Sequence, residues 1–366
     1  MMKVTLTNEI LSYITEIEHN RYKVSSVKLS KPVMNRLRKN SKKKSSYASN
    51  KIEGNPLSEK QVDEVIERDE RKHYLKPEQE VRNYFLALNF LEEKVSKKEK
   101  FSKKLILDVQ KLVEKGASKE KIGLRGPMPP GVLFAVYDSK TGNLDYIPPE
   151  YCDIPELLDE LVEYVNTTDD HPLIVAAVVH YQLVTIHPFE DGNGRTARLL
   201  SGYIMDLNGY GFNGIGSLEE YFAYDIDEYY ESIQMGLPAL YYSGRENPPH
   251  PEIWINYFLR MVKLYSGKVC DLQLASEEED IAGSLSFLKG KEKELLQFLI
   301  RNYRGEFTPI EVSRELSVSN KTVINRLAVL VKNGFAVPVF ANQRIRSYEL
   351  SEFTKDHQKE IMKEIS

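Results

Sequence analysis

One stretch decides the fold expected for this chain: His187-Pro188-Phe189-Glu190-Asp191-Gly192-Asn193-Gly194-Arg195-Thr196-Ala197-Arg198. An apolar run precedes it, from Leu173 to Val184, and apolar residues follow it at helical spacing, from Leu199 to Leu207. This pattern predicts a tight polar turn between two buried helices. Backbone N–H groups at a helix start, beside glycines that tolerate unusual dihedrals, form an anion site, and Arg195 and Arg198 lie on one face of the second helix. The stretch therefore predicts a phosphate site with a titratable base, His187, beside it.

The composition is that of an ordinary globular protein. The chain has 366 residues, of which 41% are hydrophobic and 28% charged, and its net charge is -4. This length allows two or three domains, and the charge argues against a generally basic nucleic-acid-binding protein while allowing a local basic patch. The two cysteines, Cys152 and Cys270, lack metal-ligand spacing and indicate a reducing compartment. Because we find neither a signal-like start nor a bilayer-spanning apolar run, we expect a cytoplasmic protein without membrane contact.

Residues 1–120 are expected to form an N-terminal helical region. Within it, the serines from Ser45 onward can cap a short helix that Gly54 stops, at about 45–55. Glu53 falls in the last turn of this helix, where the helix dipole disfavours a carboxylate. Some other group must therefore hold Glu53.

The pattern changes to strands at about 131–148. Val132–Tyr137 and Leu144–Ile147 read as two strands, joined by a turn-rich segment over 138–143 and closed by Pro148-Pro149. An isolated β-hairpin in an otherwise helical protein is either a flap over a site or a simple connector. The sequence leaves both interpretations open.

A tyrosine-rich helix over 218–240 follows the polar stretch and carries Tyr229 and Tyr230, and a helix over 253–263 holds the single tryptophan, Trp254. Aromatic residues at this spacing are typical of a core. Stacking of one or two of them on a purine is the alternative.

The acidic run Glu277–Asp280 marks an expected domain boundary. Residues 286–352 beyond it show a helix, a helix-turn-helix pattern and a strand pair, which is the order of a winged-helix domain of the α+β class. From Ser286 to Leu350 there are 11 Lys and Arg against 6 Glu, a net of +5, and Asn320–Lys332 contains no acid. This charge suits DNA phosphates, and docking of a protein is the alternative.

The stretch from His187 to Arg198 resembles the signature of the Fic (AMP-transferase) family, His-Pro-Phe-x-Asp-Gly-Asn-Gly-Arg-x-x-Arg, at every defining position. The resemblance extends from about residue 50 to about residue 265. It implies a mainly α fold: a Fic-type helical catalytic core over 121–275, with the hairpin as its flap, followed by the winged-helix domain. The segment Ser49-Asn50-Lys51-Ile52-Glu53-Gly54 is similar to the family's inhibitory motif, Ser/Thr-x-x-x-Glu-Gly/Asn.

The resemblance implies transfer of AMP from ATP to a hydroxyl of a target protein, on Ser, Thr or Tyr, with release of pyrophosphate. His187 would be the general base, since imidazole titrates near neutral pH. Asp191 would hold Mg²⁺ with the help of phosphate oxygens. The residues assigned to the nucleotide are Phe189, Gly192, Asn193, Gly194, Arg195, Arg198, Tyr229 and Tyr230. Phe189 would anchor the turn, and the two arginines would neutralise the β- and γ-phosphates.

The resemblance further implies that Glu53, within the motif that also contains Ser49 and Gly54, pairs with Arg198 and inhibits transfer. Asp225-Ile226-Asp227-Glu228 stands where many relatives carry Asn-Arg, which leaves the adenine contacts open. Three alternatives remain at this point: removal of AMP from a target, transfer of another phosphate-containing group, and a nucleotide-sensing regulator that binds DNA. Self-modification and a homodimer are also open.

Overall fold

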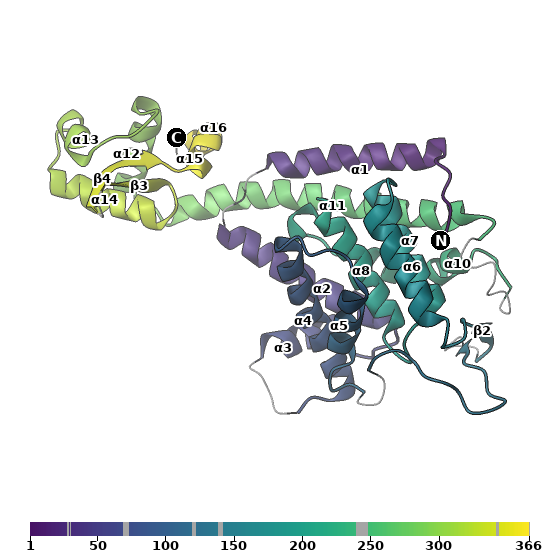
Figure 1. Ribbon diagram of the computed structural model, residues 1–366. Helices are drawn as coiled ribbons and strands as arrows, with labels where there is room; N and C mark the ends of the chain where they lie inside the picture. Colours follow the sequence, from purple (N-terminus) through teal and green to yellow (C-terminus); the bar gives the residue numbers. More distant parts are fainter. Residues whose placement is uncertain are drawn as a thin grey trace. The chain divides into compact units, whose positions relative to one another are not determined.

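The computed structural model describes residues 1–27, 29, 31–68, 73–118, 122–137, 142–238, 248–341 and 344–365. The chain divides into two compact units, one of residues 1–22 and 37–269 and one of residues 23–36 and 270–366. Figure 1 shows that most of the chain is helical. Parts of three expected features lie outside the described residues: the hairpin turn at 138–141, the end of the tyrosine-rich helix at 239–240, and the strand turn at 342–343.

The first unit contains the predicted pair of helices on either side of the polar stretch. These are α7 (Pro172–Ile186) and α8 (Asn193–Leu207), which pack closely against each other. Almost every side chain of α7 is buried, because the helix is apolar on all sides. The prediction of a polar turn between two buried helices is confirmed.

Further helices surround this pair, and α4 and α5 pack on α8. In chain order they are α1 (Asn8–Ser26), α2 (Lys31–Ile52), α3 (Glu59–Glu67), α4 (Lys76–Ser96), α5 (Lys103–Glu114), α6 (Ile154–Thr167), the 3-10 turn Phe212–Gly214, α9 (Glu219–Tyr224), α10 (Ile226–Gln234) and α11 (Pro251–Ser286). None of the helices in the described ranges is both long and apolar enough to cross a membrane.

Three helices differ from the sequence-based expectation. The helix expected at about 45–55 is the end of α2, which begins at Lys31. The tyrosine-rich helix breaks at Asp225, which is extended and accepts the backbone N–H of Glu228 on its side chain, so that α10 starts anew. The acidic run at 277–280 lies inside α11, because Glu and Asp are compatible with a helix interior and a change of composition does not end a helix.

The hairpin is present but shorter than predicted. Its strands β1 (Val136–Tyr137) and β2 (Leu144–Tyr146) are antiparallel, with Val136 opposite Tyr146. Residues 132–135 are not in a strand. Among the described residues these two strands form a sheet of their own, and such an isolated pair is only marginally stable.

The second unit follows the element order that the sequence predicts for 286–352. It contains α12 (Gly290–Asn302), α13 (Pro309–Glu315), α14 (Asn320–Lys332), β3 (Ala336–Ala341) and β4 (Arg344–Leu350). The two strands are antiparallel, and Phe307 forms an additional bridge to Tyr348. The short helices α15 (Glu352–Asp356) and α16 (Gln358–Ile365) close the unit and were not anticipated.

Candidate active site

The polar turn is closed by its own asparagine. The backbone N–H of Phe189 donates to Asn193 Oδ1 (3.0 Å), and Asn193 Nδ2 donates to the carbonyl of Phe189 (2.9 Å). Phe189 is fully buried and anchors the turn in the core, as predicted from the sequence. The side chain of Asn193 therefore braces the turn, which leaves only its backbone N–H for an anion.

Two glycines lie at the start of α8, and backbone conformation requires the first. Gly192 has φ +81°, and a Cβ there would lie 2.7 Å from Glu114 Oε1. A Cβ on Gly194 would overlap Glu53 Oε1. The carboxylate of Glu53 thus lies directly against the turn that the sequence marks as an anion site.

His187 ends α7 in a left-handed conformation, with φ 47° and ψ 58°. Its Nδ1 lies 3.3 Å from the carbonyl of Val184, so the Nδ1–H tautomer is favoured and the lone pair is on Nε2. The rings of Phe134 and Tyr146 are each centred 6.0 Å from the imidazole. Burial, together with the smaller effect of the nearby Arg125, lowers the pKa of His187 to about 4. His187 is therefore a neutral base at neutral pH.

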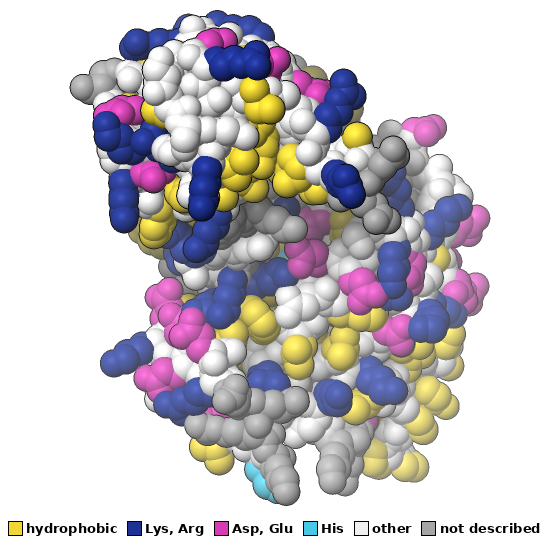
Figure 2. Space-filling model, turned by 90° about the vertical axis from the view of Figure 1, so that its left-hand side faces the viewer, with side chains coloured by type: hydrophobic (Ala, Val, Ile, Leu, Met, Phe, Trp, Pro, Cys, Tyr) yellow, Lys and Arg dark blue, Asp and Glu magenta, His cyan; other side chains and the backbone are white. Residues whose placement is uncertain are grey.

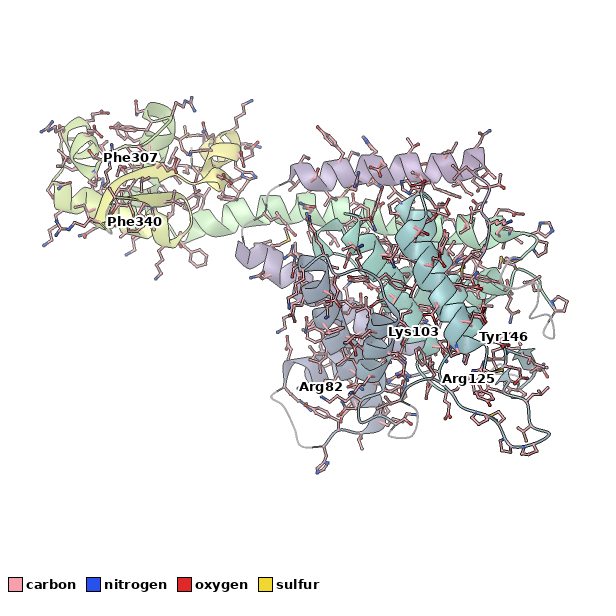
Figure 3. All side chains as sticks on the ribbon, viewed as in Figure 1. Arg82, Lys103, Arg125, Tyr146, Phe307 and Phe340 are labelled. Carbon is pink, nitrogen blue, oxygen red and sulfur yellow. The ribbon has the colours of Figure 1, made fainter. Side chains whose placement is uncertain are left out.

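Arg125 clamps the loop around His187. Its Nε donates to the carbonyl of His187 (2.9 Å), another guanidinium nitrogen donates to the carbonyl of Pro149, and the guanidinium lies over the ring of Phe134. On β2, the Tyr146 hydroxyl contacts the carbonyl of Thr185 (2.6 Å). Figure 3 shows Arg125 and Tyr146 near the base of the hairpin. Together these contacts fasten the hairpin to the end of α7.

Arg198 is held by the end of α2. Its Nε donates to Ser49 Oγ (2.8 Å), and its NH2 donates to the carbonyl of Ser49 (3.0 Å) and to Glu53 Oε1 (2.6 Å). The side chain of Arg198 is 1% exposed and that of Glu53 is 33% exposed. Gly54 then ends the helical turn with φ +79°. Arg198 is therefore the group that holds Glu53, whose position at a helix end is otherwise unfavourable.

Tyr229 orients Arg198 from the other side. Arg198 NH1 donates to the Tyr229 hydroxyl (3.3 Å), which lies 2.8 Å from Nε2 of His180. Burial keeps the pKa of His180 well below its usual value, so the imidazole is neutral and its Nε2 can accept a hydrogen bond from the Tyr229 hydroxyl. Tyr229 is buried, whereas Tyr230 is 39% exposed and lies beside the end of α2, 3.5 Å from the carbonyl of Ile52.

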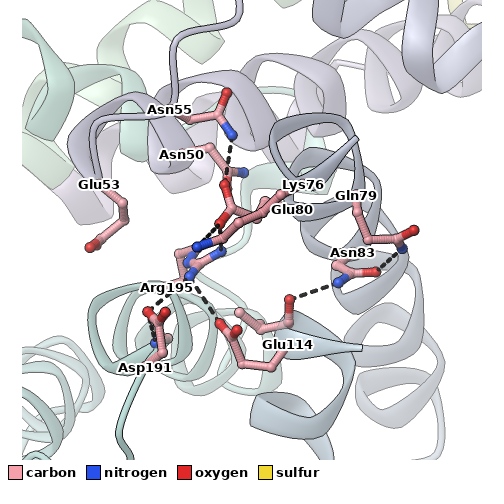
Figure 4. Close-up of polar contacts among 12 residues, drawn as sticks. Asn50, Glu53, Asn55, Lys76, Gln79, Glu80, Asn83, Glu114, Asp191 and Arg195 are labelled. Atoms are coloured by element: carbon pink, nitrogen blue, oxygen red, sulfur yellow. Dashed lines mark hydrogen bonds and ion pairs between the residues drawn. The ribbon is translucent and has the colours of Figure 1, made fainter. Parts of the chain in front are cut away.

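Arg195 lies in a nest of carboxylates, shown in Figure 4. Its NH2 donates to Glu114 Oε1 (2.9 Å) and to Asp191 Oδ1 (3.3 Å), and its NH1 lies 3.9 Å from Glu80 Oε1. Burial raises the pKa of the Glu114 carboxyl to about 7, against the opposing effect of Arg195. Only Asp191 in this group, at 30% side-chain exposure, reaches solvent appreciably.

The carboxylate of Asp191 is a suitable ligand for a magnesium ion. Within the described residues, no group of three or more His, Cys, Asp or Glu side chains could hold a metal ion by itself. Magnesium commonly takes one or two protein carboxylates and completes its shell with water and substrate phosphates. The half-exposed carboxylate of Asp191, directly before the start of α8, matches that donor set.

The structure brings the predicted residues of the turn, the inhibitory motif and Tyr229 into one site. Three residues of this site, Arg125, Glu80 and Glu114, were not predicted from the sequence. A signal existed for Glu114, since it follows Val109 and Val113 on the buried side of α5, where an acid needs a partner. No comparable signal marks Arg125, because it lies in a loop without periodicity.

Comparison with known proteins agrees with this geometry. Residues 100–205 match the model of the Fic/DOC family. The chain is 44% identical to the protein adenylyltransferase fic-1 of Caenorhabditis elegans over 72 residues, which are 19% of this chain and 14% of that protein. It is 26% identical to the protein adenylyltransferase Fic of Drosophila grimshawi over 204 residues, 54% of this chain and 40% of that protein. The matches thus span less than half of these relatives.

Solved structures share the fold. A Fic family protein from Desulfovibrio desulfuricans G20 superposes with a TM-score of 0.60 at 20% identity, over 96% of this chain and 98% of that chain. Fic-1 from C. elegans gives a TM-score of 0.56 at 24% identity, over 73% and 72%. Residues 100–205 therefore match the Fic/DOC family, and the chain has the fold of Fic proteins.

Proposed function

We propose that this chain is a protein adenylyltransferase that moves AMP from ATP to a hydroxyl side chain of a target protein. One observation carries the proposal: a neutral base, His187, ends α7 directly before a glycine turn that opens α8 with Arg195 and Arg198 on it. Base and anion site thus lie next to each other, as nucleotidyl transfer requires. The names of the matched relatives support the same reaction.

In the proposed reaction, Nε2 of His187 takes the proton of the target hydroxyl. The hydroxyl oxygen forms a bond to the α-phosphorus of ATP, and the bond to the bridging oxygen of the β-phosphate breaks, so that pyrophosphate leaves with the electron pair. The N–H groups at the start of α8, together with Arg195 and Arg198, stabilise the phosphate charge. Magnesium held by Asp191 would supply further charge neutralisation at the phosphates.

The contact between Glu53 and Arg198 supports an inhibited resting state. Glu53 occupies the guanidinium of Arg198 and lies against Gly194, where the turn would meet a phosphate. ATP phosphates bind productively only after this carboxylate has moved away. We therefore propose that α2 and the residues up to Gly54 act as an inhibitory segment.

The hairpin is proposed to dock the target. Leu133 and Tyr137 are 62% and 61% exposed, on the segment whose Phe134 contacts the His187 ring. A segment of a target protein that pairs with this hairpin would bring its Ser, Thr or Tyr hydroxyl to Nε2 of His187. The same route applies to self-modification.

Labelled ATP tests the proposal on wild type, Glu53→Gly and His187→Ala in a cell lysate. We expect weak labelling of proteins by wild type, strong labelling by Glu53→Gly and none by His187→Ala. Label on the γ-phosphate instead of the α-phosphate would indicate phosphate transfer. Release of AMP from the labelled target by wild type, in a second incubation, would assign the reverse reaction to the same site.

The second unit favours a further candidate function, binding of duplex DNA. On α14, the second helix of a helix-turn-helix arrangement, one face is exposed: Lys321, Ile324, Asn325 and Ala328, at helical spacing. Asn is suited to an adenine edge, and apolar side chains to the thymine methyl group. A helix with this face fits the major groove.

The strand pair adds positive charge. Arg344 and Arg346 are exposed on β4, and Figure 2 shows Lys and Arg side chains interspersed with hydrophobic ones on one face of the unit. Labelled duplex DNA of random sequence, titrated with the full chain at several salt concentrations, tests this function. We expect Lys321→Glu to weaken binding and Lys359→Glu, the same charge change on α16, to leave it unchanged. Equal binding by both variants would contradict recognition through α14.

A further inference from the structure

Asn55, the residue directly after the inhibitory segment, contacts α4. Asn55 follows Glu53 and Gly54, and its backbone N–H donates to the carbonyl of Asn50 at the end of α2 (3.0 Å). Its side-chain amide donates to Glu80 Oε2 (2.9 Å) and to the carbonyl of Pro77 (3.0 Å), both on α4. The end of the segment is thus fastened to α4 by one asparagine side chain.

Glu80 also lies beside the first arginine of the motif. Its Oε1 is 3.9 Å from NH1 of Arg195 and 3.7 Å from Nζ of Lys76. Among the described residues, NH1 and Nε of Arg195 are buried without a hydrogen-bond partner. Figure 4 shows Glu80 between Asn55 and Arg195. One carboxylate of α4 therefore lies between Asn55, which it holds by a hydrogen bond, and Arg195, to which it is a longer ion-pair neighbour.

The charges explain why an asparagine suits this position. Three carboxylates, those of Glu80, Glu114 and Asp191, surround Arg195, and Lys76 is the other cation within reach. Glu80 lies 3.7 Å from Lys76 and 3.9 Å from Arg195, beyond hydrogen-bond distance of both, and at 15% side-chain exposure it gains from a further donor. The neutral amide of Asn55 supplies that donor without adding charge. Glu80 loses this hydrogen bond when the segment leaves. The hydrogen bond therefore favours the closed position of the segment.

We propose that Asn55 and Glu80 form a second latch that holds the inhibitory segment closed and fastens it to the residues around Arg195. This inference rests on the proposed function only for its effect on AMP transfer. The latch itself is a property of the fold and is measured without catalysis, by hydrogen exchange. Asn55 and Glu80 are positioning residues, because neither reaches the reacting atoms.

The test uses Asn55→Asp in the full chain. The aspartate keeps the size of the side chain and the acceptor for the N–H of Leu57, but it places a carboxylate against Glu80. Asn55→Asp loses a hydrogen bond to a charged acceptor and gains a repulsion. We therefore expect the equilibrium constant for opening of the inhibitory segment to rise about tenfold or more. Glu80→Gln keeps an acceptor for Asn55 without the charge, and a smaller increase of about two- to fivefold is expected.

Opening is measured by hydrogen exchange of the backbone amides over 45–55, which needs no catalysis. Asn333→Asp is the matched control, because Asn333 also lies at a helix end, that of α14, and donates its amide to a backbone carbonyl. We expect faster exchange over 45–55 in Asn55→Asp and unchanged exchange in the control. AMP transfer should rise by the same factor, and by much less when Asn55→Asp is added to Glu53→Gly.

The outcomes separate the two proposals. The latch would be overturned if the amides of residues 45–55 exchanged at the wild-type rate in Asn55→Asp but faster than wild type in Glu53→Gly. An equal acceleration in Asn333→Asp would overturn it as well. Faster exchange in Asn55→Asp with no AMP transfer by any variant, Glu53→Gly included, would support the latch and contradict the adenylyltransferase function.

Discussion

The replacement of Glu53 by glycine tests the inhibited state most directly. Glu53 Oε1 lies 2.6 Å from NH2 of Arg198, and the guanidinium side chain is 1% exposed. Glycine removes the carboxylate at the end of α2, where the helix dipole disfavours it. The ion pair is therefore the main loss from the closed state.

The magnitude follows from this contact. A hydrogen bond to a charged partner contributes about 1.5–3 kcal/mol to stability, and about 1.4 kcal/mol changes an equilibrium constant tenfold. The fraction of molecules with an open site should therefore rise by about tenfold to about 150-fold. Arg198 keeps its two contacts with Ser49, which still hold α2, so we expect an increase near the lower end of this range.

The assay is the initial rate of self-modification with α-labelled ATP. Glu53→Gln removes only the charge of the side chain and should give an intermediate rate. The double variant Glu53→Gly with His187→Ala gives the rate without a catalytic base. The reasoning would be refuted by equal rates for wild type and Glu53→Gly, provided that the His187→Ala double variant is clearly slower than both. An increase in Glu53→Gln as large as that in Glu53→Gly would show that charge alone holds the segment.

Three further outcomes are expected. Because burial lowers the pKa of His187 to about 4, kcat/KM of the activated variant should stay level between about pH 6 and about pH 8 and fall only toward pH 4; a midpoint near about 6.5 would contradict the buried, neutral base. Tyr229→Phe removes one hydrogen bond to Arg198, so the KM for ATP should rise about two- to tenfold with an unchanged far-ultraviolet circular dichroism spectrum. Arg125→Ala leaves the carbonyls of His187 and Pro149 without their donor, at about 1–3 kcal/mol each, and should lower both the thermal midpoint and the transfer rate; an unchanged midpoint would show that water replaces the guanidinium.

Local patterns predicted the centre of the fold correctly. The apolar run of α7, the polar turn and the periodic residues of α8 are contiguous in sequence, and each follows from burial or dihedral preference within a few residues. Gly54 stops the helical turn for the same local reason. The chemistry of the turn is therefore readable before any tertiary contact is known.

The predicted ends of several helices and strands were wrong. The break at Asp225 is decided by capping, and the continuation of α11 through 277–280 shows that an acidic run by itself does not end a helix. The hairpin is shorter than its β-prone residues suggest, and within the described residues it is an isolated two-stranded sheet, which is only marginally stable. Strand and helix ends in this chain therefore needed the tertiary structure.

The sequence by itself determined which groups the site contains: a base, a carboxylate, a glycine turn and two arginines within one turn and one helix start. Only the tertiary structure decided how these groups are held. Glu53 and Arg198 are 145 positions apart, and Glu114 and Arg195 are 81 apart. Such pairs form because buried charges require partners. The packing of α4 and α5 on α8, and the contact of Ser49 on α2 with Arg198, select which partners are within reach. The resemblance suggested the first pair, whereas Arg125, Glu80 and Glu114 emerged from the fold alone.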